Sequence, residues 1–177
     1  MMDKDNYTTD PELSTSISNL SESDIPFFQR AIGLARETEK QNNLPIGAVI
    51  SLDGQIIAEG QNAIWHPRFN PNRHAEIEAL HNVPDHLWEH ARNMTLYTTL
   101  EPCLMCMGAI LLHRIGRVMY GSSDNYGGAS LVIGHMPTYF EDMVSRTEWI
   151  GPAYPSECDH LFERVMILVE KRRKSEI

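Results

Sequence analysis

Hydrophobic and polar positions follow a helical period near the start of the chain and a strand period soon after it. Between residues 24 and 41, apolar side chains recur every three or four positions, which is the stripe of an amphipathic helix. Residues 46–60 then contain two β-rich runs on either side of Asp53-Gly54. An Asp-Gly pair between apolar strands is a strong hairpin signal, so the pattern predicts a helix followed by two antiparallel strands.

Farther along the chain, helical and strand patterns alternate. Helical patterns begin at His74, Cys103, Pro137 and Pro155, and strand patterns cover residues 94–99, 117–121 and 147–150. Strands that alternate with helices favour a sheet covered by helices on both faces. Because the hairpin makes at least one strand pair antiparallel, the sequence predicts an α/β protein, a three-layer α/β/α sandwich around a central mixed sheet.

The length of 177 residues fits one globular domain and is short for two. Residues 1–23 are polar and acidic, so we expect a flexible arm there and a single domain at residues 24–177. The arm has neither the basic nor the apolar region of a secretory signal, and no apolar run approaches the roughly 20 residues of a membrane span. We therefore expect a cytoplasmic protein without a membrane partner.

Three side chains that favour transition metals lie in two short motifs. Cys103 and Cys106 are about one helical turn apart, so both sulfurs can reach one ion, and His74 begins an earlier helix. Catalytic zinc sites use three protein ligands and leave the fourth position to water, whereas structural sites close with a fourth ligand. His81 lies roughly 10 Å along its helix from His74, too far for one ion. His66, on a loop, stays an open alternative as a fourth ligand.

Glu76 stands two residues after His74 and projects from a different side of the same helical turn. A carboxylate beside a metal-activated water can accept its proton and deliver it to a leaving group. This set of parts suits attack on an amine-bearing ring carbon, followed by loss of ammonia. The sequence thus predicts Glu76 as the catalytic proton shuttle of a hydrolytic deaminase.

The pattern His-x-Glu followed by Pro-Cys-x-x-Cys resembles the zinc-dependent cytidine/deoxycytidylate deaminase superfamily. The runs LPIGAVI, GQNAIW, HAEIEAL, LYTTLEPCLMCMGAI and RIGRVMYGSSD are similar, in order and spacing, to bacterial tRNA adenosine deaminases and to guanine and cytosine deaminases. The resemblance covers about residues 25–129. It implies a cytidine deaminase-like fold with a five-stranded sheet, one zinc ion (Zn2+) per subunit and a homodimer.

The resemblance also implies roles for individual residues. The implied zinc ligands are His74, Cys103 and Cys106. Asn62 matches the asparagine that hydrogen-bonds the bound base, and the backbone at Gly47 and Ala48 lines the base pocket. Asp124 is a further candidate for contact with the substrate. For both Asn62 and Asp124, a role in the local turn or loop is the alternative.

The predicted substrate class depends on departures from the tRNA-acting relatives. Those proteins carry basic residues after the aspartate that matches Asp124, whereas this chain has SSDNYGGAS, without Lys or Arg. The formal net charge of −9 also argues against a large nucleic-acid partner. A free purine such as guanine is therefore the first prediction, a cytosine-type base or nucleoside the next, and a wobble adenosine in tRNA the main macromolecular alternative. A zinc-stabilised binding protein without turnover is the alternative of another class.

Overall fold

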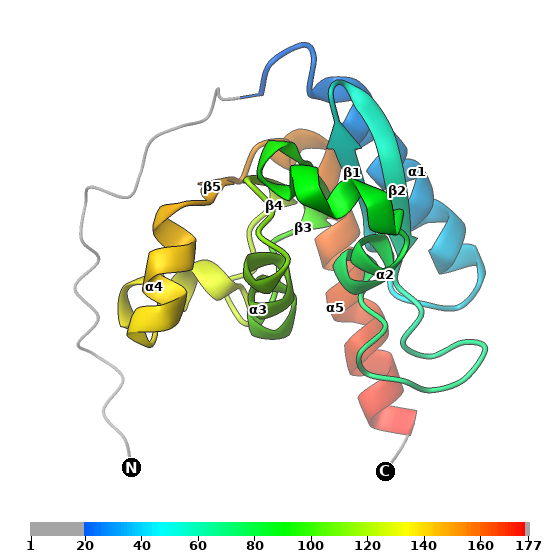
Figure 1. Ribbon diagram of the computed structural model, residues 1–177. Coiled ribbons are helices and arrows are strands. Elements are labelled where there is room, and N and C mark those ends of the chain that lie inside the picture. The colour runs from blue at the N-terminus through cyan, green and yellow to red at the C-terminus, as the bar shows by residue number, and fades with distance from the viewer. Residues whose placement is uncertain (1–19, 176–177) are drawn as a thin grey trace, which may run out of the picture.

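A five-stranded mixed sheet lies at the centre of the protein, in the strand order β2-β1-β3-β4-β5. The computed structural model describes residues 20–175, so the predicted arm at residues 1–23 falls almost entirely outside the described residues. The strands are β1 (Gly47–Leu52), β2 (Gln55–Gln61), β3 (Thr95–Leu100), β4 (Arg117–Ser122) and β5 (Glu148–Ile150). Helices cover both faces of the sheet (Figure 1), which confirms the predicted three-layer α/β/α sandwich.

Helices pack on the sheet according to the alternation of its side chains. The α-helices of the described chain are α1 (Ile25–Lys40), α2 (Ala75–His81), α3 (Leu104–Leu112), α4 (Thr138–Ser145) and α5 (Pro155–Ser175), and two 3-10 segments cover Asp85–Asn93 and Ala129–His135. Val49 and Tyr97 face α1, which in turn packs on α5. Ile50 and Leu96 face α2 and α3 on the opposite side. Within residues 20–175, no helix combines the length and apolar character needed to cross a bilayer.

The predicted hairpin is present and sets the direction of the first strands. β1 and β2 pair antiparallel, and Asp53 (φ 50°) and Gly54 (φ 77°) have the left-handed conformations that a tight two-residue turn requires. β1 also pairs antiparallel with β3, whereas β3, β4 and β5 run parallel to one another. The start of β1 therefore lies beside the carboxyl ends of β3 and β4, and this edge of the sheet carries the candidate site.

Two glycines allow helices to approach the sheet closely. A Cβ on Gly60 in β2 would overlap the backbone of Ala75 and Ala79 in α2. On the other face, a Cβ on Gly47 in β1 would lie only 2.8 Å from the backbone nitrogen of Ala35 in α1. Only glycine fits at these two contacts, because a bare backbone is needed for such an approach. The contacts fix how far α1 and α2 stand from the sheet.

Asp24, at the amino end of α1, is a buried carboxylate with 3% of its surface exposed. It accepts hydrogen bonds from the Tyr97 hydroxyl (2.8 Å), Arg117 Nη1 (3.0 Å) and the Ser21 hydroxyl (2.8 Å). Burial by itself raises the pKa of Asp24, but the bonds from Arg117, Ser21 and Tyr97 together hold this pKa below its usual value. The carboxylate therefore joins α1 to β3 and β4.

We expect the substitution Asp24→Asn to lower the free energy of unfolding at pH 7 by about 2 kcal/mol, because it weakens charge-assisted hydrogen bonds in a buried site. A carboxyl whose pKa is lowered by folding stabilises the protein above its unfolded pKa of about 3.9. That stabilisation is lost as the pH falls through the lower, folded pKa. The difference between wild type and Asp24→Asn should therefore shrink in acid, and urea unfolding at neutral and at acidic pH measures it.

The exposed partner of Arg117 supplies the control for this experiment. Glu148 lies 3.3 Å from Arg117 Nε with 63% of its side chain exposed. An exposed pair contributes little, so Glu148→Gln should cost less than about 0.5 kcal/mol. Equal losses of unfolding free energy in the two variants would show that burial does not strengthen the interactions of Asp24.

Candidate metal centre and active site

Two helix amino termini face each other at the edge of the sheet where β3 and β4 end. His74 is the residue before α2 and Cys103 the residue before α3, and both have extended backbone (ψ 154° and 174°). Neither side chain makes a hydrogen bond that caps its own helix. Both side chains point toward each other instead, and Cys106 joins them from the first turn of α3.

The three side chains implied as zinc ligands form one cluster. Their ligand atoms all lie within 4.8 Å of one another. Cys103 Sγ is 3.7 Å from both His74 Nδ1 and Cys106 Sγ. With Zn–S bonds of about 2.3 Å, a tetrahedral site places two sulfurs roughly 3.8 Å apart. The donor set and its spacing therefore fit a zinc ion, and His66 is not part of the cluster.

The two thiols differ in their affinity for a proton. Hydrogen bonds from Cys106 and His74 lower the pKa of the Cys103 thiol to about 4, although burial opposes this change. The hydrogen bond to Cys103 and burial both raise the pKa of Cys106. The pair thus keeps one proton near neutral pH. A bound cation would displace that proton, because metal ligation requires thiolates.

Glu76 lies beside the cluster without belonging to it. It sits on the first turn of α2 and is only 3% exposed. Its Oε2 is 3.5 Å from Cys106 Sγ, and its Oε1 accepts a hydrogen bond from the Thr98 hydroxyl at 3.3 Å. Burial raises the pKa of this carboxyl. A carboxyl with a raised pKa can alternate between its neutral and charged forms, as a proton carrier must.

Asn62 follows β2 and is fully buried. Its backbone N–H donates to the carbonyl of Ile46 at 2.9 Å, which places it next to the start of β1. Its Oδ1 accepts from the N–H of Ile64 at 3.3 Å, whereas its Nδ2 has no hydrogen-bond partner among residues 20–175. A buried amide with an unused donor is costly, unless a ligand completes its hydrogen bonds.

Gly47 and Ala48 form the start of β1, next to the strand that contacts Glu76. Ala48 is paired with Thr98 of β3, the residue whose hydroxyl binds Glu76. The N–H of Gly47 donates to Thr99 Oγ1 at 3.3 Å. The backbone predicted to line a base pocket is therefore one strand away from the predicted proton shuttle. Thr98 carried no sequence signal of its own, since it lies in an apolar run that indicates only a buried strand.

Asp124 lies near the start of the loop after β4 and accepts hydrogen bonds from within that loop. Its Oδ1 accepts hydrogen bonds from the N–H groups of Tyr126 (2.9 Å) and Gly127 (3.0 Å). Its own N–H donates to Glu101 Oε2 at 2.9 Å. The structure thus gives Asp124 the loop role that the sequence left open. A contact with substrate stays a prediction.

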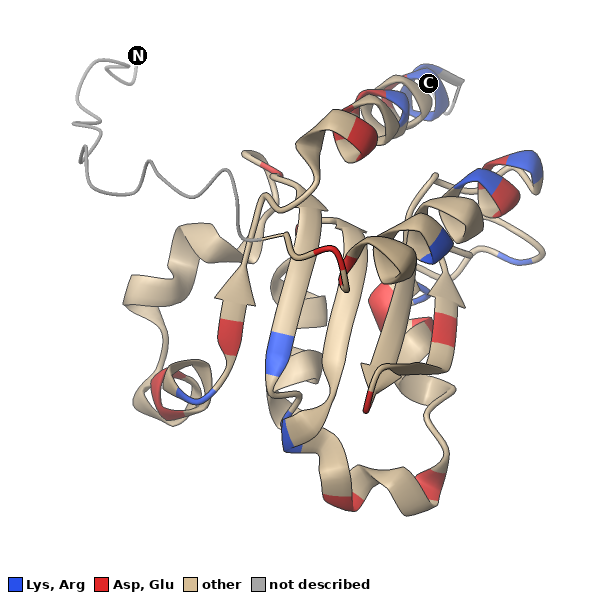
Figure 2. Cartoon of the chain, turned by 90° about the horizontal axis from the view of Figure 1, so that it is seen from above, with Lys and Arg blue, Asp and Glu red and all other residues tan. Residues whose placement is uncertain are grey.

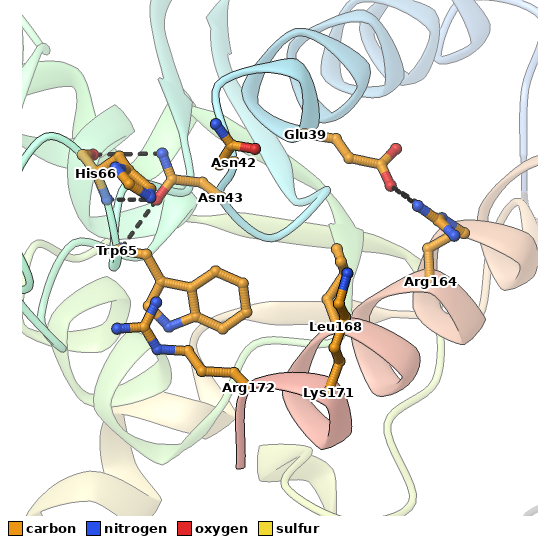
Figure 3. A pocket seen from close by; sticks show the side chains of 9 residues that line it. All are labelled: Glu39, Asn42, Asn43, Trp65, His66, Arg164, Leu168, Lys171 and Arg172. Carbon is orange, nitrogen blue, oxygen red and sulfur yellow. Dashed lines mark hydrogen bonds and ion pairs between the residues drawn. The ribbon is translucent and has the colours of Figure 1, made fainter. Parts of the chain in front are cut away.

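A groove of about 430 Å³ lies between the loop after α1, the loop after β2 that leads to His74, and the helix α5 (Figure 3). Asn43 Oδ1 accepts the N–H groups of Trp65 and His66, each at 2.9 Å, which fixes the loop that leads to His74. The guanidinium of Arg172 stands 5.0 Å from the centre of the Trp65 ring. The final turns of α5 are rich in Lys and Arg (Figure 2), so this side of the groove is basic.

Arg73, directly before His74, is paired with a residue of α2, the helix that follows. Its guanidinium bonds the carboxylate of Glu78 in α2, with Nη2 2.7 Å and Nε 3.1 Å from the two oxygens. The pair is partly exposed, with 35% of the Arg73 side chain and 22% of the Glu78 side chain accessible. Arg73 therefore lies along the outer side of α2 beside His74.

Known proteins similar to this chain are consistent with this arrangement. Residues 22–148 match the sequence model of the MafB19-like deaminase family. A tRNA-specific adenosine deaminase of Haemophilus influenzae is 37% identical over 158 residues, which cover 87% of each chain. The match extends past the motifs and includes most of the fold.

Two solved structures are similar to this chain in both sequence and fold. A structure from work on A-to-I editing by tRNA:A34 deaminases at the wobble position is 36% identical, with a TM-score of 0.58, and covers 64% of this chain and 90% of that one. A guanine deaminase of Bacillus subtilis is 34% identical, with a TM-score of 0.54, and covers 64% of this chain and 77% of that one. The two neighbours differ in substrate and share the fold.

Proposed function

The chain belongs to the MafB19-like deaminase family, and from this premise we propose that it is a zinc-dependent deaminase whose substrate is an adenosine in tRNA. As a deaminase it is a hydrolase that acts on carbon–nitrogen bonds of nucleobases or nucleosides. Membership confirms that the chain is an enzyme and a relative of tRNA adenosine and guanine deaminases. It argues against the alternative of a zinc-stabilised binding protein without turnover.

The observation that carries the proposed chemistry is a buried carboxylate beside a three-ligand cluster. Zinc, when bound by His74, Cys103 and Cys106, supplies a Lewis acid that makes water nucleophilic near neutral pH. Glu76 accepts the proton of that water and delivers it to a ring nitrogen of the base. It then transfers the hydroxyl proton to the leaving amine, which departs as ammonia while the ring carbon becomes a carbonyl. The Nδ2 of Asn62, buried and unpartnered in the described chain, donates to the base edge.

Support for a tRNA substrate comes from the relatives and from the groove that contains Trp65. The Haemophilus protein, similar over most of both chains, is named for adenosine in tRNA. The groove combines the indole of Trp65 with Lys171 and Arg172, and aromatic and cationic side chains suit single-stranded RNA. These observations move tRNA ahead of guanine, which the sequence had placed first.

Guanine remains the second candidate because two observations favour it. The loop at residues 122–130 contains no Lys or Arg, so it offers phosphates no cation. The guanine deaminase of Bacillus subtilis is nearly as similar in sequence as the tRNA-editing structure. A cytosine-type base has no specific support in the structure.

Ammonia release across a substrate panel tests the proposal. The panel contains a tRNA anticodon stem-loop with adenosine at the wobble position, free guanine, adenine and cytosine, and their nucleosides. We expect kcat/KM for the stem-loop to exceed that for every small compound by about tenfold or more. Faster turnover of guanine than of the stem-loop would overturn the tRNA assignment, and release from no compound would overturn the deaminase assignment.

We expect Asn62→Ala to lower kcat/KM by about 10- to 100-fold, because a hydrogen bond to the substrate from a buried donor contributes about 1–3 kcal/mol. Steady-state ammonia release measures the change. Asn82→Ala is the matched control, since its amide lies at the end of α2 and bonds the Glu59 carbonyl away from the site. Equal losses in the two variants, or none in Asn62→Ala, would remove Asn62 from the binding site.

A homodimer is proposed from the exposed side of α3. Leu104 and Leu112 on this helix are 58% and 54% exposed, and between them a Cβ at Gly108 would meet no atom within 4 Å. These residues are four positions apart and form an apolar stripe suited to a second copy of the helix. Sedimentation equilibrium should give twice the mass of one chain, and a single-chain mass at micromolar concentration would contradict the dimer.

We also expect the enzyme to work in the cytoplasm.

A further inference from the structure

Glu101 is a buried carboxylate between β3 and the metal-binding turn of α3. It is 4% exposed and stands two residues before Cys103. Its oxygens accept three hydrogen bonds, all from residues 124–130, which are the loop that follows β4 and the first two residues of the 3-10 segment Ala129–His135. Oε2 accepts the N–H of Asp124 at 2.9 Å, and Oε1 accepts the N–H of Ser130 at 3.0 Å together with the Ser130 hydroxyl. Residues at the two ends of one loop therefore converge on one carboxylate.

The same loop touches the segment that holds the metal-binding sulfurs. Cys103 and Gly128 form a β-bridge, and the N–H of Ala129 donates to the carbonyl of Pro102 at 2.9 Å. Ala129 is fully buried. A Cβ on Gly128 would overlap the Glu101 carboxylate and would lie 2.5 Å from the carbonyl oxygen of Asp124. The loop at residues 124–130 is thus packed directly against the turn that carries Cys103.

The tip of the loop is exposed while its ends are fixed. Tyr126, at the tip, has 82% of its surface accessible. β4 ends at Ser122, which pairs with Leu100 of β3, so the loop leaves the sheet at the edge where the site lies. Ligands of open α/β sheets bind beyond the carboxyl ends of the strands. A loop with fixed ends and an exposed aromatic tip at this edge is placed to contact the substrate.

We propose that Glu101 is a positioning residue that holds the loop at residues 124–130 in its substrate-binding conformation. The inference rests on the proposed deaminase function and deepens it, because it assigns part of substrate binding to a loop outside the zinc cluster. Glu101 suits this role since an ionised carboxylate only accepts hydrogen bonds, and all its partners in the loop are donors. Glutamine has the same shape but replaces one acceptor by a donor. The one remaining oxygen can accept from Asp124 or from Ser130, but not from both.

Two variants and one control test this role. Glu101→Gln breaks the hydrogen bonds to either Asp124 or Ser130. Gly128→Ala pushes the loop at residues 124–130 away from Glu101 and leaves the carboxylate itself unchanged. Gly134→Ala is the matched control, because a Cβ there would meet no atom within 4 Å. For each protein we would measure zinc content, kcat, KM and amide hydrogen exchange of residues 124–130, on the substrate that the wild-type enzyme turns over best.

We expect Glu101→Gln and Gly128→Ala to raise KM about tenfold, with kcat within about threefold of wild type and one zinc ion still bound per chain. Exchange at residues 124–130 should accelerate in both variants and stay unchanged in Gly134→Ala. An unchanged KM in both variants, or a fall in kcat that parallels loss of zinc, would overturn the inference. If the wild-type enzyme prefers guanine over RNA, the tRNA assignment fails, while the change in KM for guanine still decides the role of Glu101.

Discussion

Replacement of Glu76 by alanine is expected to reduce ammonia release by about 10²- to 10⁴-fold, the range associated with loss of a general acid–base group. Glu76 lies 3.5 Å from Cys106 but is not one of the three clustered ligands, so the variant should still bind one zinc ion per chain. Single-turnover ammonia release, together with zinc analysis of the same sample, separates loss of chemistry from loss of metal.

A second glutamate on α2 provides the control. Glu78 is two residues farther along, is paired with Arg73 and lies on the partly exposed side of the helix. Glu78→Ala should therefore keep near-normal turnover, with a small loss of stability. Full activity in Glu76→Ala would refute the proton-shuttle role. Loss of zinc in that variant would instead mean that the carboxylate supports the metal.

Replacement of Cys106 by alanine is expected to remove zinc and turnover together. Its side chain is fully buried, and a site reduced to His74 and Cys103 lacks the three protein ligands of a catalytic zinc centre. Because metal binding contributes to the stability of the folded state, the melting temperature should also fall. Elemental analysis, ammonia release and thermal unfolding test the three expectations on one preparation.

Cys158 is the matched control for a buried cysteine without a metal partner. It is also fully buried, and it packs with Ile32, Ala35 and Leu161 between α1 and α5. Cys158→Ala should lower the melting temperature through lost packing while zinc content and turnover stay at the wild-type level. A Cys106→Ala protein that retains zinc would show that another side chain completes the site.

The parts of this structure that sequence predicts well are those encoded by local spacing. The hairpin follows from Asp53-Gly54, and the cluster follows from ligands placed one helical turn apart at helix amino ends. His74 and Cys103 could be placed at those ends because each follows a loop and precedes a helical pattern. Resemblance to known deaminases then added Asn62, whose burial and unpartnered amide fit a base contact. That role awaits experiment.

Other features depend on contacts between distant segments and left no local signal. Asp24 meets Arg117, 93 residues later, only because the amino end of α1 lies over β3 and next to the start of β4. Glu101 lies in a familiar motif, but its three donors come from a loop more than 20 residues away. The proposed substrate contacts left no local signal either. They involve loop side chains such as Trp65 and Tyr126, whose positions follow from tertiary packing and not from spacing.

The close contact between Gly60 and α2 has a consequence for how this protein can evolve. Any side chain at position 60 would push against Ala75 and Ala79, the helix neighbours of Glu76, and would shift Glu76 relative to the sulfurs of Cys103 and Cys106. Natural variation should therefore accumulate in the loops, where it alters which molecules are accepted. A substitution at Gly60 is therefore expected to lower turnover of every substrate, whereas loop substitutions are expected to change which substrate is preferred.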